Sequence, residues 1–173
     1  GGSCFPKDTK AITTTADQFK IDLSVIKSVI KSNKNRSLVL LKRSIELLNG
    51  KVKDKKICFL GVTFKANTDD MRDSSSLKMI PSLAKRGAKI KYYDPTGYKK
   101  EFSRYKNVTF SNDIKSAMAQ YDLVIIHTEW NDFKSISFKS IMKNKKYVIF
   151  DMRNIYSQKK MKQLRINYFC VGG

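Results

Sequence analysis

Ile57-Cys58-Phe59-Leu60-Gly61-Val62 is a short apolar run of the kind that forms a buried strand. A polar stretch, residues 63–76, follows it, and apolar residues then recur at helical spacing over 77–84. The polar loop has two interpretations, a ligand site and a solvated connection. A ligand site is possible because open α/β sheets bind ligands at the carboxyl ends of their strands. Lys65 and Arg72 in the loop are suited to phosphate oxygens. The loop contains no Gly-x-Gly-x-x-Gly, so the sequence predicts no dinucleotide turn here.

The same alternation of apolar runs and helical patterns continues through residues 53–173. Residues 123–126, Leu-Val-Ile-Ile, are apolar throughout, as expected for a strand that is buried on both faces. We therefore predict an α/β fold: a Rossmann-like, mostly parallel sheet with helices on both faces and right-handed crossovers. The predicted strands are 57–62, 89–93, 107–110, 123–127, 147–151 and 167–171, and the predicted helices are 75–86, 113–119, 137–143 and 158–163.

The segment before the first strand is expected to be helical, because residues 7–49 contain neither proline nor glycine and carry apolar residues at helical spacing. We predict one helix near the start and then a long amphipathic helix, bent around Ser32 to Asn35 and ended by Gly50. The chain is thus expected to divide into a helical segment, residues 1–50, and a sheet domain, residues 51–173.

Gly1-Gly2-Ser3-Cys4-Phe5-Pro6-Lys7-Asp8-Thr9 contains a candidate nucleophile. Pro6 suits the first turn of a helix, so Cys4 would lie just before a helix N-terminus. The partial positive charge there, together with Lys7, favours a thiolate. Two glycines let the backbone approach a ligand closely. The alternative is that Cys4 is an ordinary small apolar residue and that the glycines remain from an expression tag, and this spacing does not decide between them.

Five motifs, in order, carry a resemblance to a known family. They are Gly1-Gly2-Ser3-Cys4-Phe5-Pro6-Lys7-Asp8-Thr9-Lys10-Ala11, Phe64-Lys65-Ala66-Asn67-Thr68-Asp69-Asp70-Met71-Arg72-Asp73-Ser74, Tyr93-Asp94-Pro95, Thr128-Glu129-Trp130-Asn131 and Phe150-Asp151-Met152-Arg153-Asn154-Ile155. They are similar to the motifs of the nucleotide-sugar 6-dehydrogenases, the UDP-glucose/GDP-mannose dehydrogenase family. The Cys-Phe-Pro-Lys-Asp-Thr form most resembles the UDP-glucose 6-dehydrogenases.

The resemblance implies that this chain is the C-terminal portion of such an enzyme. In the family, an NAD-binding Rossmann domain comes first, a long central helix follows the catalytic cysteine, and a Rossmann-like domain holds the UDP part of the substrate. The cofactor NAD would then be bound mainly by a missing N-terminal domain, and the fragment would be inactive alone. The long helix would build a homodimer, although packing on the missing domain is equally compatible with its apolar face.

The resemblance also implies a role for individual residues in the oxidation of UDP-glucose to UDP-glucuronate by two NAD. Cys4 would form a thiohemiacetal and then a thioester, and Asp8, one helical turn away, would hold or activate the hydrolytic water or simply complement the helix N-terminus. The implied substrate-binding residues are Gly1, Gly2, Phe5, Phe64, Lys65 and Arg153, and the implied cofactor-binding residue is Arg72. Two other functions stay open: a dehydrogenase for GDP-mannose or a UDP-N-acetylhexosamine, and a non-catalytic module that binds a UDP-sugar and dimerises.

Three further polar positions follow predicted strands. His127, the only histidine, is expected to be structural or to support ligand-binding residues rather than to act as a base. Asp94 stands where a dinucleotide fold would hold its ribose, but without a glycine fingerprint a structural turn with Pro95 is favoured. Glu129-Trp130 is expected to form a structural corner beside the ligand.

The composition limits the other functional classes. The formal net charge is +20, but the lysines are scattered rather than gathered in one basic stripe, so we expect no nucleic-acid partner. Three cysteines at positions 4, 58 and 170 fit neither a disulfide framework nor a zinc spacing, and we expect no metal. With no apolar run of membrane-spanning length and no signal-peptide pattern, a cytoplasmic protein without a membrane association is predicted.

Overall fold

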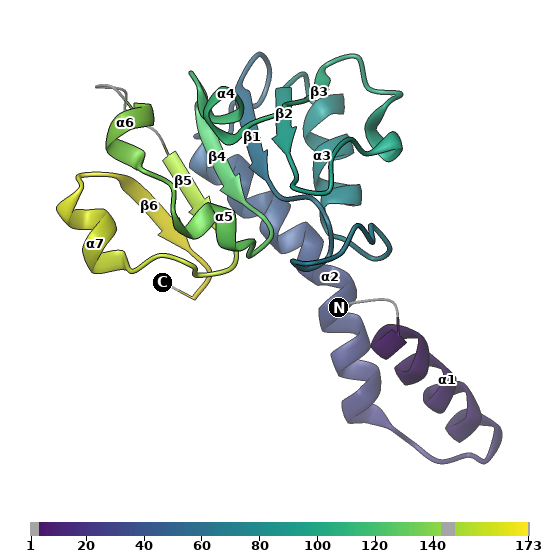
Figure 1. Cartoon of the computed structure of the whole chain (residues 1–173). Coiled ribbons are helices and arrows are strands. Elements are labelled where there is room, and N and C mark those ends of the chain that lie inside the picture. The colour runs from purple at the N-terminus through teal and green to yellow at the C-terminus, as the bar shows by residue number, and fades with distance from the viewer. Residues whose placement is uncertain (1–3, 143–147, 173) are drawn as a thin grey trace.

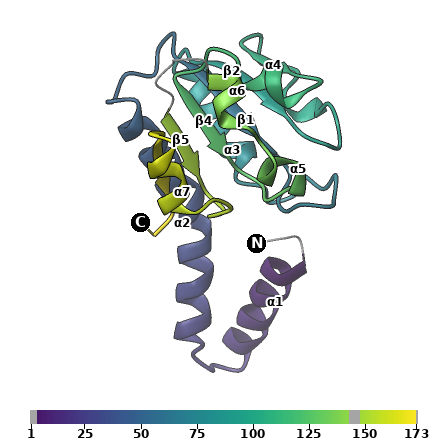
Figure 2. The same cartoon turned by 60° about the vertical axis from the view of Figure 1, so that its left-hand side comes forward.

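The structure, a computed structural model, describes residues 4–142 and 148–172. It consists of an α/β domain from which a hairpin of two helices, α1 (Cys4–Gln18) and α2 (Ser24–Leu47), extends (Figures 1 and 2). The polypeptide then enters a six-stranded sheet. Its strands are β1 (Lys56–Leu60), β2 (Lys89–Tyr93), β3 (Val108–Phe110), β4 (Leu123–Ile126), β5 (Val148–Asp151) and β6 (Asn167–Cys170).

The sheet has the strand order β3-β2-β1-β4-β5-β6, and every neighbouring pair is parallel. This is the order of the doubly wound Rossmann fold, in which the chain first builds outward in one direction from β1 and then returns to build outward in the other. The predicted parallel, Rossmann-like sheet is confirmed. All six predicted strands occur within two residues of their expected bounds; residue 147, at the predicted start of β5, lies outside the described residues.

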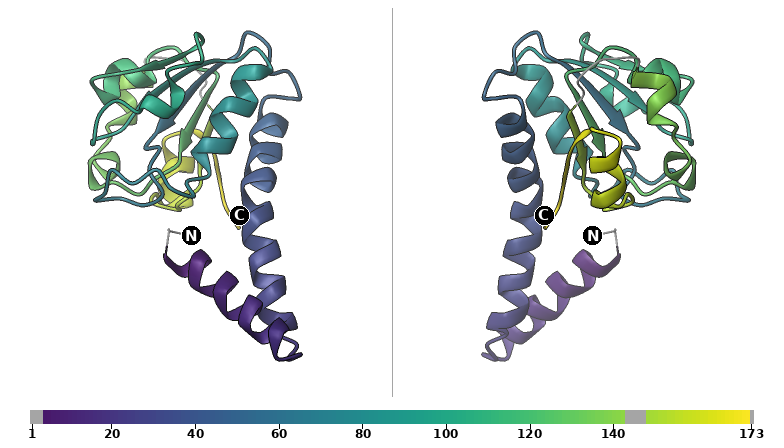
Figure 3. Two further views of the ribbon diagram at one scale, coloured as in Figure 1. Left: turned by 90° about the vertical axis from the view of Figure 1, so that its right-hand side faces the viewer. Right: turned by 90° about the vertical axis from the view of Figure 1, so that its left-hand side faces the viewer.

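Side chains that alternate along each central strand build two separate apolar layers. Ile57 and Phe59 of β1 pack with α2 and with α3 (Ser76–Lys85), whereas Cys58 and Leu60 pack on the opposite face. All four are fully buried, and burial of such side chains stabilises a fold by roughly 1.5–3 kcal/mol each. The view in Figure 3 shows α2 and α3 side by side on one side of the sheet. The predicted helices on both faces are therefore present.

The second face is covered by short helices. They are α4 (Ile114–Met118), α5 (Asn131–Lys134), α6 (Phe138–Met142) and α7 (Gln158–Gln163), and a 3-10 turn, η1 (Lys100–Phe102), follows β2. The predictions located α3, α4, α6 and α7, with residue 143 outside the described residues. They missed α5 and η1, which are too short to carry a helical period.

The helical segment differs from its prediction in two ways. Helix α2 runs without interruption through Ser32 to Asn35, where a bend was expected, and the chain instead turns at residues 19–23. Lys20, with φ of 58°, makes that turn: its N–H donates to the carbonyl of Asp17 and the N–H of Ile21 to that of Ala16. This is a Schellman motif with lysine at the left-handed position, where glycine is usual. Without a glycine at this position, no helix stop signal could be recognised there.

The second difference concerns the start of α1. Among the described residues this helix begins at Cys4, so Cys4 belongs to its first turn rather than preceding it, and Pro6 is its third described residue. A proline remains compatible with this position, because the first-turn N–H groups have no partner within the helix.

The two halves of α2 have different surroundings. The half nearer β1 is held on the sheet by Leu40 and Leu41, which belong to the same core cluster as Ile57 and Phe59. The other half contacts α1 and leaves apolar side chains in solvent. The exposed large apolar residues of this hairpin are Phe5, Ile12, Phe19, Ile21, Val25, Val29, Leu38 and Val39. The expected division at residues 50 and 51 stays a prediction, and α2 packs on the sheet across it.

Candidate functional site

The loops that follow β1, β4 and β5 meet at the carboxyl edge of the sheet. β1 and β4 are neighbours from which the chain departs in opposite directions, and open α/β sheets bind ligands at such a switch point. The first turn of α1 faces this edge (Figures 1 and 3). The fold therefore gathers the motifs that are far apart in the sequence at one end of the sheet.

The loop after β1 begins with a close backbone contact. Gly61 has φ of +76°, and a Cβ placed on it would lie 2.5 Å from Thr128 Cβ, so only glycine fits here. Thr128 Oγ1 donates to the carbonyl of Thr63 at 3.1 Å, and Thr63 Oγ1 donates to the carbonyl of Lys65 at 2.9 Å. The start of the loop is thereby attached to the end of β4.

Lys65 and Phe64 lie next in this loop. The Lys65 side chain is exposed, and its Nζ lies 5.5 Å from the centroid of the Phe64 ring. A cation in solvent over an aromatic ring at a sheet switch point is available to an anionic ligand. The roles of both residues in substrate binding remain predictions, for which this placement is favourable.

Arg72 is held farther along the loop by Asp70. Its Nε lies 3.0 and 3.1 Å from the two carboxylate oxygens of Asp70, and its Nη2 lies 2.8 Å from Oδ2. The guanidinium lowers the pKa of the Asp70 carboxyl by hydrogen bonding to its charged form. The Asp70 carboxylate holds the guanidinium in one orientation, and the Arg72 side chain is 74% exposed. Its role toward a cofactor stays a prediction.

Arg153, which follows β5, joins three loops. Its Nε donates to the carbonyl of His127 at 2.7 Å, and its Nη2 donates to the carbonyl of Phe64 at 2.8 Å. Glu129 Oε2 lies 3.1 Å from the same Nε, whose single hydrogen is directed at His127. Glu129 Oε2 is consequently buried without a hydrogen bond. The structure thus gives Arg153 a role between loops, and its predicted contact with substrate stays a prediction.

His127 is 1% exposed at the end of β4. Burial, with a smaller contribution from the nearby Arg153 charge, lowers its pKa to about 3, so the ring is neutral at pH 7. Its Nε2 shares a hydrogen bond of 2.7 Å with Ser75 Oγ, and its Nδ1 lies 3.2 Å from Thr128 Oγ1. A histidine enclosed in this way fits the structural role expected from the sequence and not that of a general base.

Two buried carboxylates organise neighbouring loops. Asp94 is 1% exposed and accepts hydrogen bonds from the N–H groups of Val62 and Thr63 and from the N–H and hydroxyl of Thr96. This is a structural turn, as favoured from the sequence, and it leaves Asp94 no capacity for a ribose. Asp151, which the sequence reasoning did not single out, is fully buried and accepts from the N–H of Arg153. Its place at the end of a strand in the fifth motif was the available signal.

The cysteine motif is described only from residue 4 onward. Gly1 and Gly2, the two predicted substrate-binding glycines, lie outside the described residues. Phe5 and Asp8 belong to α1 and are exposed, Phe5 by 64%. The first turn of α1 faces the sheet edge described above, and the predicted roles of Cys4, Phe5 and Asp8 stay predictions.

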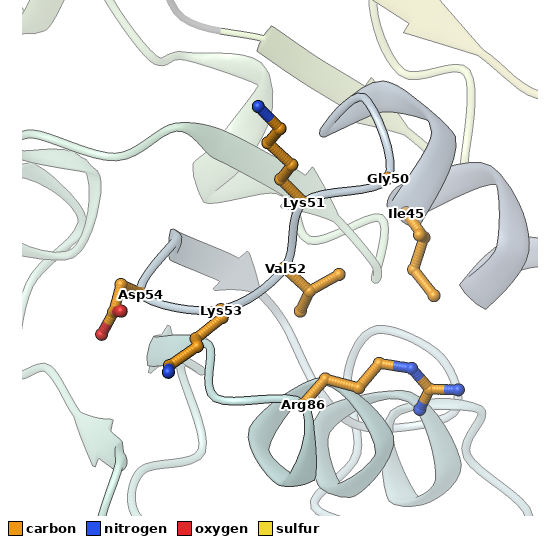
Figure 4. Close-up of a pocket in the computed structure, with 7 residues that line it drawn as sticks. All are labelled: Ile45, Gly50, Lys51, Val52, Lys53, Asp54 and Arg86. Atoms are coloured by element: carbon orange, nitrogen blue, oxygen red, sulfur yellow. The ribbon is translucent and has the colours of Figure 1, made fainter.

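A surface hollow at the opposite end of the sheet has a different character (Figure 4). Lys51, Lys53 and Arg86 line it together with Ile45, Gly50, Val52 and Asp54. The three cationic groups point in different directions in Figure 4, so they do not converge on a common anion. The hollow therefore lacks the convergent cations of a phosphate site.

The described part of the chain contains neither a cluster of metal ligands nor a membrane-spanning helix. In residues 4–142 and 148–172 no three histidine, cysteine or acidic side chains come together as metal ligands would. None of the helices in those ranges is both long and apolar enough to span a bilayer.

Comparison with known proteins gives independent information on the same residues. Residues 58–158 match the model of the UDP-glucose/GDP-mannose dehydrogenase family, UDP binding domain, and residues 1–35 match that of the central domain of the same family. The chain is 35% identical to the UDP-glucose 6-dehydrogenase of Rickettsia felis and 37% identical to that of Rickettsia typhi, over 99% of its own length. It covers only 39% and 40% of those proteins.

A solved structure agrees with this similarity. A UDP-glucose dehydrogenase from the hyperthermophilic archaeon Pyrobaculum islandicum superposes with a TM-score of 0.78 at 28% identity. The superposition covers 92% of this chain and 36% of the other. The chain therefore spans well under half the length of the relatives that it matches.

Proposed function

The chain belongs to the UDP-glucose/GDP-mannose dehydrogenase family, and we propose that it forms the UDP-sugar-binding and cysteine-bearing portion of a UDP-glucose 6-dehydrogenase. The complete enzyme would oxidise UDP-glucose to UDP-glucuronate. The observation that carries the proposal is the Phe64–Lys65 loop at the switch point between β1 and β4, held by Arg153. In this proposal the exposed Lys65 ammonium neutralises a nucleotide diphosphate there.

The described residues do not provide a dinucleotide cradle. The loop after β1 contains Gly61 as its single glycine, and Asp94 is saturated by internal hydrogen bonds. Arg72, which is exposed and oriented by Asp70, fits a phosphate of a dinucleotide bound elsewhere. We therefore propose that NAD is bound mainly by a part of the enzyme outside these residues. When bound, NAD supplies the oxidant by accepting one hydride from the sugar in each of two oxidations.

In the proposed reaction, Cys4 retains the substrate between the two oxidations. After the C6 alcohol has become an aldehyde, the Cys4 thiolate adds to that carbon, the carbonyl oxygen takes a proton from solvent, and a thiohemiacetal forms. Loss of a hydride from the same carbon, and of the hydroxyl proton to solvent, gives a thioester. Water attacks the thioester carbonyl, the C–S bond breaks with the Cys4 thiolate as the leaving group, and the carboxylate product is released. The N-terminus of α1 favours the thiolate over the thiol, and Asp8, one turn later, would accept the proton of the water.

Calorimetry on the 173-residue chain tests the nucleotide site. UDP-glucose is expected to bind and GDP-mannose is not, because the proposed site takes a uridine nucleotide. Tight binding of GDP-mannose or a UDP-N-acetylhexosamine in place of UDP-glucose would favour the other dehydrogenases of the family. Lys65→Gln is expected to weaken the binding of UDP-glucose by about tenfold. The matched control is Lys78→Gln, because Lys78 is an exposed lysine on α3.

Turnover of NAD tests the catalytic assignment. The chain alone is expected to reduce no NAD with UDP-glucose, whereas the complete enzyme does so and loses this activity on Cys4→Ser. Unchanged turnover in the Cys4→Ser enzyme would disprove the nucleophile. If the 173-residue chain binds UDP-glucose but the complete protein shows no turnover, the chain is a non-catalytic binding module.

We further propose that the complete protein is a homodimer built through the α1–α2 hairpin. The proposal rests on the eight large apolar side chains of this hairpin that are exposed to water in the single chain. A second copy packed along the hairpin would remove apolar surface from water.

A further inference from the structure

The loop that carries Lys65 and Arg72 has a closed neck. Its first residues are Thr63 and Phe64, and it ends at Ser75, immediately before α3. Its beginning is bonded to Thr128 and its end to His127, two consecutive residues that directly follow β4.

The hydrogen bonds across this neck have one consistent direction. Thr128 Oγ1 donates its only hydrogen to the carbonyl of Thr63, so it must accept from His127 Nδ1. A neutral imidazole that carries its hydrogen on Nδ1 has an acceptor at Nε2, and Ser75 Oγ therefore donates to it at 2.7 Å. The chain of bonds runs from Ser75 through His127 and Thr128 to Thr63, and it connects the end of the loop with its beginning.

Arg153 reinforces the same neck from β5. It donates to the carbonyl of His127 and to that of Phe64, so the backbone of β4 and the first part of the loop are held together a second time. The imidazole itself has a cost, because a buried polar ring loses its hydration. The surrounding side chains, such as Phe59 with its ring 6.4 Å away, would accept an apolar residue at this position.

We propose that His127 is a positioning residue for nucleotide binding: it closes the neck of the 63–75 loop and thereby fixes where Lys65 and Arg72 stand. His127 does not touch the ligand. It keeps the loop in one conformation before the ligand arrives. The free energy needed to order the loop is then not subtracted from the binding free energy of the nucleotide. The inference rests on the proposed UDP site for its functional part, whereas the closed neck is a property of the loop itself.

Three variants of the 173-residue chain test the role. His127→Leu removes both ring hydrogen bonds and puts an apolar side chain of similar volume in their place. His127→Gln keeps a group that can accept from Ser75, and Ser75→Ala removes only the Ser75–His127 hydrogen bond. Ser82→Ala, which changes a hydroxyl on the same helix away from the neck, is the control. Hydrogen exchange of amides 65–73 and calorimetric affinity for UDP are measured for each.

For His127→Leu we expect about tenfold faster exchange within 65–73 and about tenfold weaker UDP binding, with unchanged exchange in β2. Ser75→Ala should follow in the same direction, His127→Gln should recover most of the affinity, and Ser82→Ala should match the wild type. Unchanged loop exchange in His127→Leu, or equally faster exchange throughout the sheet, would overturn the proposal. If the loop exchange responds but the wild-type chain binds no UDP, the closed neck stands and the proposed function fails.

Discussion

Arg153 Nη2 donates to the carbonyl oxygen of Phe64 at 2.8 Å, which joins the loop after β5 to the loop after β1 although 89 residues separate them. The neighbouring Nε donates to the carbonyl of His127, so one guanidinium holds two carbonyls in a fixed relation. A planar fork with two donors is the property that distinguishes arginine from lysine.

Arg153→Lys is therefore expected to behave as a severe change. Lysine keeps the charge but presents one ammonium in place of two directed N–H groups, so one of the two carbonyls loses its partner. We expect a loss of about 1–2 kcal/mol in the free energy of unfolding, measured in urea. Arg104→Lys, at an exposed arginine whose guanidinium lies 5.0 Å from the Tyr105 ring centroid, is the matched control and should leave the midpoint nearly unchanged.

Two glycines with similar backbone angles separate strain from crowding. Gly61 (φ +76°) and Gly97 (φ +85°) both stand in the left-handed region, but a Cβ would collide with Thr128 only at Gly61. Gly97→Ala is expected to cost about 1–2 kcal/mol from the backbone alone, and Gly61→Ala roughly 2–5 kcal/mol. Thermal unfolding checks both, and equal losses in the two variants would contradict the close contact at Gly61.

The single histidine predicts a pH dependence of stability. His127 has a pKa of about 3 in the fold and about 6.5 when unfolded, so the unfolded chain binds the extra proton. The stabilisation is fully present above pH 6.5 and is lost as the pH falls from there toward 3. Between pH 6 and 5 the free energy of unfolding should fall by about 1.4 kcal/mol per pH unit at most.

Urea titrations from pH 7.5 to 5 on the wild type and on His127→Gln measure this loss. The variant should show little pH dependence in the same window, because carboxyl groups with ordinary unfolded pKa values titrate mostly below it. Imidazole NMR signals that titrate near pH 6.5 in the folded chain would contradict the buried, neutral ring.

Asp94→Asn tests the carboxylate beneath the loop. The amide has one acceptor oxygen and an NH₂ group, so it cannot accept from the donors on both sides of the present carboxylate. We expect a loss of roughly 1–3 kcal/mol in the free energy of unfolding. Asp122→Asn is the control at the opposite edge of the sheet, where a half-buried carboxylate accepts from Lys56 N and pairs with Lys55. It should lose less than about 1 kcal/mol.

The proposed dimer is checked on the hairpin. Val25→Glu places a charge on a side chain that is 76% exposed in the single chain and would be buried between two copies. In sedimentation experiments the Val25→Glu form of the complete protein should be a monomer. Tyr98→Glu, at an exposed aromatic residue outside the hairpin, should leave the dimer intact. A dimer that tolerates Val25→Glu would locate the interface elsewhere.

Much of the fold was predictable, because alternating apolar strands and helical patterns leave few arrangements open. The run 123–126 predicted β4 correctly, and it is buried at all four positions. The turn between α1 and α2 was not predictable, since its left-handed residue is Lys20 rather than glycine. A lysine that adopts this conformation is selected by the packing of the two helices and leaves no mark in the local sequence.

The candidate site was predictable in its loops but not in its internal contacts. Lys65, Arg72 and Arg153 were singled out as cations that follow strands or lie in the polar loop. Arg153 reaches the carbonyl of His127 because of the register between β4 and β5, and His127 and Thr128 reach the two ends of the loop because of the register between β1 and β4. Such pairings join residues that are far apart in the chain, and sequence spacing carries no information about them.

The uninterrupted course of α2 has a mechanical consequence. Its 24 residues make a rod about 36 Å long that is anchored on the sheet at one end and carries α1 at the other. From the anchor at Leu40 to Ser24 the free arm is about 24 Å long, so a tilt of about 5° displaces its far end by about 2 Å. The packing of Leu40 and Leu41 under the sheet therefore sets the reach of the cysteine-bearing helix toward the sheet edge. Cavities created at these two residues would alter that reach from a distance.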